Sequence, residues 1–263
     1  MNHHLSHAPK GRPTVIVTGA SSGLGRSFTR ILDETLPEAV DLWLIARRPD
    51  KLRATADELR RPVRLFDLDL RDPRSIHTLA ETLAAETPDV HLLINNAGVG
   101  TAEPFESTSA DEAMGLCDLN VRAVTGMTSI VLPYMREGAD ILLTASVASF
   151  LPQPGFATYA ASKAYVLSFG RALREELKGR GIHVTITCPN PMLTDFFSDD
   201  AREDLLHSYK RIAIEDVDEV AQKTLDAMRR RRVVVVTSPW GRLIRFFGKI
   251  IPTGWILRWI RWD

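Results

Sequence analysis

The sequence predicts an α/β fold in which a single doubly wound parallel sheet is flanked by helices on both faces. Two observations predict this class. Short runs of Val, Ile and Leu alternate with longer stretches of helical periodicity, and a glycine-rich turn directly follows the first apolar run. The chain has 263 residues, 44% of them hydrophobic and 25% charged, which suffices for one large domain with a buried core.

The apolar runs lack the polar alternation of half-exposed strands, as expected for a parallel sheet that is covered on both faces. Seven candidate strands follow this pattern: Thr14–Val17, Leu42–Ile45, Val63–Phe66, Leu92–Ile94, Ile141–Leu143, His183–Thr187 and Val233–Val236. Five helices are expected between them, at Leu24–Leu36, Ser75–Glu86, Asp111–Val131, Tyr159–Lys178 and Val217–Arg229. Such an alternation is connected by right-handed crossovers.

The chain divides into three segments. Residues 1–12 are a polar lead-in that we expect to be disordered, residues 13–238 form the α/β domain, and residues 239–263 form a C-terminal tail. The lead-in lacks the apolar stretch of a signal peptide, and we expect no metal site from its histidines. The two cysteines, Cys117 and Cys188, provide no disulfide framework, so a reduced cytoplasmic compartment is expected.

The turn after the first strand, VIVTGASSGLGR over residues 15–26, has two interpretations. Residues 19–23 match G-x-S-x-G, the turn that exposes a nucleophilic serine in an α/β-hydrolase. Gly19, Gly23 and Gly25 match instead a turn that places a dinucleotide pyrophosphate on a helix N-terminus. The position after the first strand favours the glycines, because a hydrolase turn normally follows several strands.

Three further motifs follow in order. LINNAG (Leu93–Gly98) follows the fourth strand, Ser146 follows the fifth, and YAASK (Tyr159–Lys163) begins the next helix. With T-G-x-x-x-G-x-G at Thr18–Gly25, they resemble the short-chain dehydrogenase/reductase family, in its short single-domain branch. The resemblance covers roughly Thr14–Met228 and implies a Rossmann-like fold that binds a nicotinamide cofactor.

Tyr159 and Lys163 are four residues apart and therefore lie on the same face of a helix. A free phenol has a pKa of about 10. An ammonium about 4 Å away favours the phenolate by roughly 4 kcal/mol at an effective dielectric near 20, before desolvation opposes it. We therefore expect Lys163 to bring the pKa of Tyr159 towards neutrality, where a general acid or base is most effective.

The resemblance implies a role for each of four catalytic residues. Tyr159 donates a proton to the substrate carbonyl oxygen, and Lys163 lowers the tyrosine pKa and holds the nicotinamide ribose. Ser146 stabilises the developing oxyanion. Thr144 and Ser149 are alternatives, but the spacing to Tyr159 favours Ser146. Asn120 orders a water in a proton relay near the lysine.

The resemblance also implies the cofactor contacts. These are Gly19, Ser21, Ser22, Gly23, Leu24, Gly25, Arg47, Arg48, Asp69, Asn95, Ala97, Gly98, Tyr159, Lys163, Pro189 and Thr194. The second strand ends in Ala46-Arg47-Arg48, which lacks the acid that would accept from the ribose 2′-hydroxyl and offers guanidinium groups for a 2′-phosphate. The sequence therefore predicts NADP(H) in preference to NAD(H).

Two cofactor positions leave alternatives. Asp69 matches the family's adenine contact, with Asp67 as the second candidate. Asn190 stands where the family usually has glycine after proline. Asparagine accepts a left-handed backbone better than most residues, so the replacement is tolerable if the backbone there is left-handed.

The segments after the fifth and sixth strands supply the expected substrate pocket. Its residues are apolar: Phe150, Leu151, Pro152, Phe156, Met192, Leu193, Phe196 and Phe197. A lipophilic or acyl-chain carbonyl is therefore expected rather than a sugar. The sequence does not identify the substrate, its stereochemistry or the physiological direction.

The tail is basic and rich in tryptophan. From 229 to 262 there are nine Lys or Arg and no acid, which leaves 24 basic and 32 acidic residues in 1–228, a net charge of −8. Four of the five tryptophans lie in the tail: Trp240, Trp255, Trp259 and Trp262. This composition is typical of an interfacial helix on an anionic membrane. It is equally compatible with a tail that covers the core or an oligomer interface.

The sequence thus predicts an NADP(H)-dependent carbonyl reductase, working reversibly as an alcohol dehydrogenase on a small-molecule substrate. The alternative is a catalytically silent NADP(H)-binding or membrane-scaffold protein. The resemblance implies a homo-oligomer. We expect a cytoplasmic location, with peripheral association at the inner membrane face through the tail, and no nucleic-acid partner.

Overall fold

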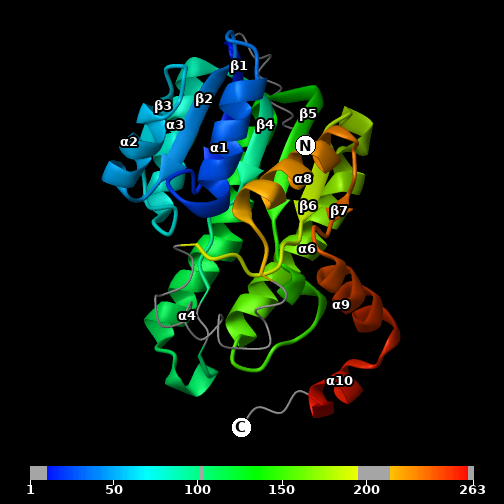
Figure 1. Cartoon of the computed structure of the whole chain (residues 1–263). Coiled ribbons are helices and arrows are strands. Elements are labelled where there is room, and N and C mark those ends of the chain that lie inside the picture. Colours follow the sequence, from blue (N-terminus) through cyan, green and yellow to red (C-terminus); the bar gives the residue numbers. More distant parts are fainter. Residues whose placement is uncertain (1–10, 101–102, 195–213, 260–263) are drawn as a thin grey trace, which may run out of the picture.

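One sheet organises the molecule (Figure 1). The computed structural model describes residues 11–100, 103–194 and 214–259. Seven parallel strands lie in the order β3-β2-β1-β4-β5-β6-β7. They are β1 (Pro13–Thr18), β2 (Asp41–Ala46), β3 (Arg64–Asp67), β4 (Asp89–Asn95), β5 (Met135–Thr144), β6 (His183–Thr187) and β7 (Val234–Val235). The predicted fold class and all seven candidate strands are confirmed.

Nine α-helices lie within the described ranges. They are α1 (Gly23–Thr35), α2 (Pro49–Asp57), α3 (Pro73–Glu86), α4 (Ala110–Cys117), α5 (Val124–Val131), α6 (Ala157–Leu177), α8 (Val217–Arg229), α9 (Pro239–Ile250) and α10 (Thr253–Trp259). The single helix expected over Asp111–Val131 is α4 and α5 joined by a wide turn, Asp118–Ala123, whose hydrogen bonds span five residues. Helix α2 was not expected, because it buries only Leu52 and Thr55.

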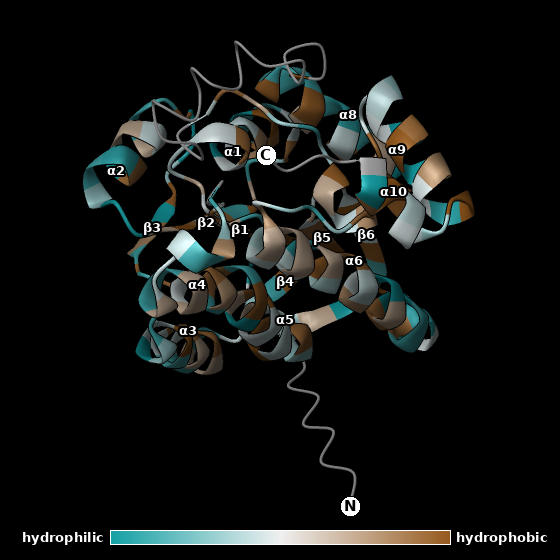
Figure 2. Ribbon diagram, turned by 90° about the horizontal axis from the view of Figure 1, so that it is seen from below, coloured by the Kyte–Doolittle hydropathy of each residue, from teal (hydrophilic) through white to brown (hydrophobic). Residues whose placement is uncertain are grey.

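The helices form two layers, one on each face of the sheet (Figure 2). Helices α3, α5 and α6 cover one face, and α1, α2 and α8 cover the other. Successive side chains of a strand point to opposite faces. In β1, Ile16 accordingly joins the first core, whereas Val15 and Val17 join the second. The apolar strand pattern arises because both faces of the sheet are buried.

The start of the described chain is hydrogen-bonded to the domain. Gly11 donates its N–H to the Thr87 carbonyl at 3.0 Å, and the Arg12 carbonyl accepts from the Asp89 N–H at 3.2 Å. The rest of the lead-in, residues 1–10, lies outside the described residues.

Candidate active site

The candidate site lies beyond the carboxyl ends of the strands. Strands β1, β2 and β3 extend the sheet in one direction, whereas β4 to β7 extend it in the other. The strand order therefore reverses between β1 and β4. Ligands of doubly wound sheets bind at such a reversal.

The turn from β1 to α1 requires its glycines. Gly19 and Gly23 have left-handed backbones, with φ of 69° and 50°. A Cβ on Gly19 would lie 2.9 Å from the Ala97 Cα, and one on Gly25 would lie 2.1 Å from the Gly19 carbonyl oxygen. Helix α1 begins after Ser22 with no side-chain cap and no acid in its first turn. Its first N–H groups are thus suited to an anion such as a pyrophosphate.

Two residues outside the predicted set hold the strand ends together. The Thr18 hydroxyl accepts from the N–H groups of Asn96 and Ala97 at 3.0 and 3.1 Å. It donates to the Ile94 carbonyl at 3.2 Å. The Asn96 side chain accepts from the Thr144 hydroxyl at 3.3 Å, which adds β5 to the network. The sequence signals were the threonine before the first glycine and the second asparagine of LINNAG.

Ser146, Tyr159 and Lys163 are brought together at the end of β5. The Ser146 hydroxyl hydrogen-bonds with the phenol of Tyr159 and accepts the Ala148 N–H at 3.2 Å. The Lys163 ammonium donates to the Thr144 carbonyl at 2.9 Å and lies 5.8 Å from the centre of the Tyr159 ring. Both Ser146 and Lys163 are buried.

The two alternatives to Ser146 are engaged elsewhere. The Thr144 hydroxyl donates to the Asn96 side chain. The Ser149 hydroxyl donates to the Ser146 carbonyl and lies 3.9 Å from the Cys188 sulfur. The hydroxyl that meets the Tyr159 phenol is therefore that of Ser146.

The pKa values of the tyrosine and lysine differ from the expectation. Burial raises the pKa of Tyr159 to about 12, against a smaller lowering by the hydrogen bond with Ser146. Burial also lowers the pKa of Lys163 to about 8. Desolvation disfavours the charged form of each group and outweighs the attraction expected between ammonium and phenolate. In this structure Tyr159 is a neutral phenol at neutral pH.

Asn120 lies in the wide turn between α4 and α5 and is completely buried. Its Oδ1 accepts the Val99 N–H at 2.9 Å, and its Nδ2 donates to the Val99 carbonyl at 2.9 Å and to the Ser162 hydroxyl at 3.0 Å. A Cβ on Gly98 would lie 3.1 Å from Asn120 Oδ1 and 3.2 Å from Lys163 Nζ. The Asn120 amide thus holds the 98–99 segment close to the lysine, and its role in a proton relay stays a prediction.

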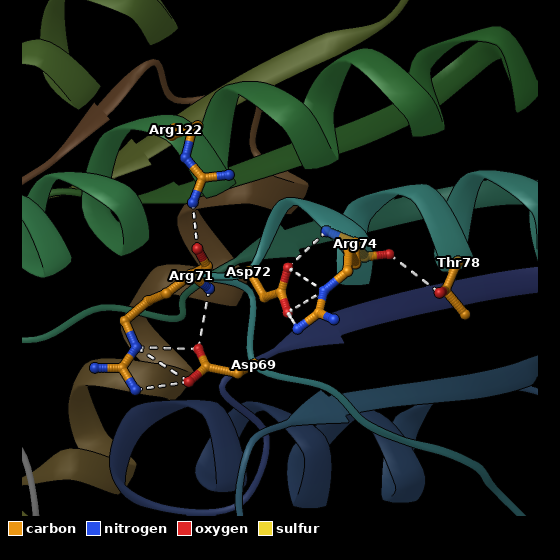
Figure 3. A network of polar contacts seen from close by, with 6 residues as sticks. All are labelled: Asp69, Arg71, Asp72, Arg74, Thr78 and Arg122. Atoms are coloured by element: carbon orange, nitrogen blue, oxygen red, sulfur yellow. Dashed lines mark hydrogen bonds and ion pairs between the residues drawn. The ribbon is translucent and has the colours of Figure 1, made fainter.

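The arginines after β2 lie on the β2–β3 side of the reversal point. Arg48 Nη2 donates to the Ser22 hydroxyl in the glycine turn at 3.0 Å. Arg47 Nη1 lies 3.9 Å from the Asp69 carboxylate. Arg71 binds that carboxylate more closely, at 2.6 Å from Nη2, and this hydrogen bond holds the pKa of Asp69 below its usual value (Figure 3).

The loop that carries Asp69 is fixed to the helix above it. Arg122, in the wide turn, donates to the Arg71 carbonyl (Figure 3). Asp72 caps α3 by accepting the Arg74 N–H at 2.8 Å. The position of Asp69 is therefore set by Arg71 and Arg122 and by the cap that Asp72 forms on α3.

Two predicted cofactor contacts have side chains that serve the fold. Leu24 is buried in the second core, and Asn95 Nδ2 donates to the Thr128 hydroxyl of α5 at 2.9 Å. In such positions only the backbone can meet a cofactor. Among the remaining predicted contacts, the Pro189 carbonyl accepts the Val147 N–H at 3.0 Å. Thr194 lies against Gly23, with its Cβ 3.2 Å from where a glycine Cβ would be.

The backbone of Asn190 is not left-handed, so the replacement of glycine at this position is not explained by that conformation. The non-glycine residues with positive φ in the described ranges are Thr87 and Arg231. The Asn190 N–H donates to Glu215 Oε2 at 2.8 Å, which fixes the backbone after Pro189 without a left-handed turn. Both polar atoms of the Asn190 amide are buried without a hydrogen-bond partner among the residues described.

A hollow lies beside Tyr159 on the α4 side. Its lining is mixed: Phe105, Leu116 and Phe156 contribute apolar surface, and Glu103, Thr108, Glu112 and Thr158 contribute polar groups. The Phe156 ring meets the Tyr159 ring edge-on, with centroids 5.8 Å apart. Phe156 was predicted for the substrate pocket, whereas Phe105 and Leu116 were not, because they come before the fifth strand. Of the other predicted residues, Phe196 and Phe197 lie outside the described residues.

Comparisons with known proteins agree with this geometry. The short chain dehydrogenase family model matches residues 13–205. Sulfoacetaldehyde reductase 2 of Chromohalobacter salexigens is 35% identical over 69% of this chain and 73% of its own length. The NADP-dependent 3-hydroxy acid dehydrogenase YdfG of Escherichia coli is 32% identical over 65% of this chain and 69% of its own length.

Two solved structures have the same fold. A short-chain dehydrogenase from Sphingobium yanoikuyae in complex with NADPH has a TM-score of 0.76 and 28% identity, over 95% of this chain and 96% of that one. A Burkholderia phymatum relative in complex with NAD has a TM-score of 0.77 and 26% identity, over 92% and 94%. The chain belongs to the short-chain dehydrogenase/reductase family and is an NAD(P)-dependent oxidoreductase that acts on alcohol or carbonyl substrates.

Proposed function

We propose that the protein is an NADP(H)-dependent reductase of lipophilic or acyl-chain carbonyls that also runs in reverse as an alcohol dehydrogenase. The observation that carries this proposal is the junction of Ser146, Tyr159 and Lys163 beside the glycine turn. Phe105, Leu116 and Phe156, which line the hollow beside Tyr159 together with polar residues such as Glu103 and Glu112, support a lipophilic substrate.

The residues present fit a nicotinamide dinucleotide. Gly19, Gly23 and Gly25 form a cradle that a Cβ would fill, and the uncapped first turn of α1 offers N–H groups to the pyrophosphate. When bound, the nicotinamide supplies or accepts the hydride. The Lys163 ammonium, held by the Thr144 carbonyl, is available to the nicotinamide ribose.

The protein's own groups manage the proton. Because the pKa of Tyr159 is about 12, its phenol carries a proton at neutral pH and can give it to a carbonyl oxygen. The Ser146 hydroxyl hydrogen-bonds with that phenol and can meet the same oxygen, where it stabilises the negative charge that develops. Lys163, with a pKa of about 8, carries a positive charge at neutral pH beside the tyrosine.

Replacing the tyrosine tests the assignment. Tyr159→Phe should lower NADPH-dependent ketone reduction by about 10²- to 10⁴-fold, since the general acid is lost. NADPH binding, measured by fluorescence titration, should stay close to that of the wild type. Tyr165→Phe is the matched control, because Tyr165 lies on the same helix and its hydroxyl meets Thr125.

The two outcomes separate the proposal from its alternative. Unchanged turnover in Tyr159→Phe would contradict the assigned acid. If neither the wild type nor the variant reduces a panel of ketones, aldehydes and 3-oxoacyl thioesters of graded chain length, while NADPH binds tightly, the protein is a silent NADP(H)-binding or scaffold protein.

We infer a preference for NADP(H) over NAD(H) from the arginines after β2. Ala46 leaves no carboxylate to repel a 2′-phosphate, and Arg48 already contacts the glycine turn through Ser22. Arg48→Ala should raise the KM for NADPH about 10-fold or more and leave the KM for NADH nearly unchanged. Arg53→Ala, an exposed arginine of α2, is the control. Equal changes for both cofactors would contradict the preference.

Two further proposals concern the assembly and the location of the protein. We propose a homo-oligomer, as the family resemblance implies. We propose a cytoplasmic protein with peripheral association at the inner membrane face. Two free thiols, Cys117 and Cys188, support the reducing compartment.

A further inference from the structure

Helix α9 packs on the domain through glycine. A Cβ on Gly241 would lie 2.7 Å from Val236 Cγ1 and 2.8 Å from Val147 Cγ1. One on Gly248, two turns further along, would lie 3.1 Å from Leu151 Cδ2. The side of α9 that faces the domain therefore buries few side-chain atoms of its own.

The large apolar side chains of α9 face away from the domain. Leu243, Phe246, Phe247 and Ile250 are spaced i, i+3, i+4 and i+7, and their exposed fractions are 45%, 58%, 48% and 61%. Trp240 at the start of the helix is 51% exposed. We call these five residues the outer face of α9. A helix that covers a core has the opposite arrangement, with its apolar side inward.

The exposed apolar surface continues into the second tail helix. Trp255 of α10 is 67% exposed and Leu257 is 37% exposed. Figure 2 shows hydrophobic segments of α9 and α10 at the margin of the molecule, apart from the two core layers. A contiguous apolar surface of this kind marks a site of interaction with a protein or a membrane.

The charge beside the outer face favours an anionic lipid surface. Arg242, Arg245 and Lys249 lie along the flank of α9, and the stretch 229–262 contains no acid. A groove beside β7, which Arg242 also lines, adds three further cations: Lys223, Arg230 and Arg232, with Asp226 as the acid among its residues. Basic residues beside exposed tryptophan and phenylalanine are typical of helices that lie in the interface of anionic bilayers.

Other ways of covering the outer face agree less well with the structure. In a two-fold dimer the same patch meets itself, so the basic flanks of two copies would repel each other. A membrane span is also ruled out for the described helices, none of which is long and apolar enough to cross a bilayer. The geometry therefore favours a helix pair that lies on the membrane surface.

The tail helix also touches the segment that carries the candidate serine. Gly241 lies against Val147, directly after Ser146, and Gly248 lies against the Phe150 carbonyl. The Arg245 guanidinium lies 5.9 Å from the centre of the Phe150 ring. Figure 1 shows α9 and α10 beyond the carboxyl ends of the strands, on the same side of the molecule as α4 and the candidate site.

We propose that the outer face of α9, with α10, docks the protein on an anionic lipid bilayer, and that the docked enzyme takes its carbonyl substrate from the lipid phase. The second half of this proposal rests on the proposed function. A substrate that partitions into the bilayer can then reach the aromatic rings of Phe105 and Phe156 beside Tyr159 without crossing bulk water.

Vesicle binding tests the docking surface. The full chain should cosediment with vesicles of phosphatidylcholine and phosphatidylglycerol, and much less with phosphatidylcholine alone. The double variant Phe246→Ser/Phe247→Ser should lose binding to both, since the apolar insertion is removed. Arg242→Gln/Lys249→Gln should weaken binding to the anionic vesicles by about 30-fold. Met114→Ser, an equally exposed apolar residue of α4, is the control, and circular dichroism verifies that each variant folds.

Several results would overturn the docking surface. These are equal binding to both vesicle types, binding that survives in Phe246→Ser/Phe247→Ser, or no binding at all. A different result would show that the outer face contacts a second copy of the chain. In that case the wild type does not bind vesicles and forms a larger species than Phe246→Ser/Phe247→Ser in size-exclusion chromatography.

Turnover tests substrate delivery separately. A long-chain ketone held in anionic vesicles should be reduced at least about 10-fold more slowly by Phe246→Ser/Phe247→Ser than by the wild type. A short-chain, water-soluble ketone should be reduced equally by both. Equal rates on the vesicle-held ketone would overturn delivery from lipid. Loss of all turnover in the wild type, with vesicle binding intact, would instead contradict the proposed function alone.

Discussion

At the scale of the residue, the candidate site contains three ionisable groups whose pKa values burial shifts towards the neutral form. Tyr159, Lys163 and Cys188 are all shifted by burial, to pKa values of about 12, 8 and 11. A neutral phenol is the form that can donate a proton, so burial prepares Tyr159 for carbonyl reduction. The lysine loses its proton far more readily than an exposed lysine does.

These pKa values have a measurable effect on stability. Lys163 has a pKa of 10.5 when unfolded and about 8 when folded. Between these values the unfolded chain binds the proton that the fold has released, so the lysine's contribution to the free energy of unfolding rises with pH. Tyr159 and Cys188 contribute with the opposite sign, because their folded pKa values lie above their unfolded ones.

Lys163→Met isolates the lysine's contribution. The wild type should gain stability relative to this variant as pH rises from about 8 to 10, which urea unfolding at several pH values would measure. Lys178→Met, at an exposed lysine just after α6, should give a curve parallel to that of the wild type. If the plot of stability against pH for Lys163→Met also runs parallel to that of the wild type, the lowered pKa of Lys163 is contradicted.

The sequence predicted the residues that gather at the site. It predicted their hydrogen bonds and pKa values less completely. The spacing of Ser146, Tyr159 and Lys163 specifies one helix face and the strand end beside it. The amide of Asn120 is different, because its partner Val99 is 21 residues away, and such a bond depends on how two separate segments pack. The pKa of Tyr159 was likewise missed, since a pair of charges in a sequence does not reveal how deeply they are buried.

At the scale of the element, the start of α1 depends on the absence of a single methyl group. Gly25→Ala would put a Cβ 2.1 Å from the Gly19 carbonyl oxygen and 2.7 Å from Asn96 Nδ2. We expect a loss of about 1–3 kcal/mol or more in the free energy of unfolding, because backbone must move. NADPH binding should weaken as well.

Gly115→Ala provides the contrast. Gly115 is also in a helix, and apart from its chain neighbours and the backbone of its own helix no described atom lies within 4 Å of where its Cβ would be. Alanine should therefore stabilise α4 by up to about 1 kcal/mol, as in an exposed helix. Thermal unfolding of both variants would measure the difference, and equal effects would show that the close approach at Gly25 is unimportant.

Elements with strong periodicity were predicted well, and those with local departures were not. The wide turn at Asp118–Ala123 interrupts a helix whose apolar pattern is continuous, so the sequence indicated one helix. The bonds from Asn120 to Val99 and Ser162, which lie outside the helix, accompany that interruption. Helix α2 was missed for the opposite reason. Only two of its nine residues are buried, so its periodic apolar signal is weak.

At the scale of the whole molecule, one buried ion pair joins the first helix to the connection before β3. Arg61 Nε lies 2.9 Å from Asp33 Oδ1, with side chains only 11% and 4% exposed. The same guanidinium donates to the carbonyls of Asp33 and Leu36, and so closes the end of α1. Burial would raise the pKa of Asp33, but hydrogen bonds from the Arg60 backbone and from Arg61 hold it below 3.8.

Arg61→Met should lower the free energy of unfolding by about 3–5 kcal/mol at neutral pH, because it leaves a buried carboxylate without its partner. The difference from the wild type should shrink as pH falls through the acidic range, because the unpartnered Asp33 of the variant binds its proton at a higher pH than the wild-type carboxyl, whose pKa lies below 3.8. Arg26→Met removes an exposed pair with Glu58 and should cost no more than about 1 kcal/mol. Chemical unfolding would measure the loss of free energy of unfolding in both variants. Similar losses would contradict a larger contribution from the buried pair than from the exposed one.

The overall architecture was predictable because buried strands and amphipathic helices repeat along the chain, and the order of the motifs fixed the edge at which the site lies. The orientation of the tail relative to the domain was not predictable from the sequence. Its apolar residues could equally have covered the core. Only the contacts of Gly241 and Gly248 with the domain reveal that they face outward.

This orientation of α9 gives the two sides of one short helix different roles: one side attaches the helix to the domain, and the other contacts the surroundings. The positions that keep it attached are glycines, where almost any substitution would collide with Val147, Val236 or Leu151. The positions that meet the surroundings carry bulky side chains that are about half exposed. In evolution the outer face can therefore change its size, charge or hydrophobicity step by step, and the enzyme can be moved to another environment while its fold and chemistry stay as they are.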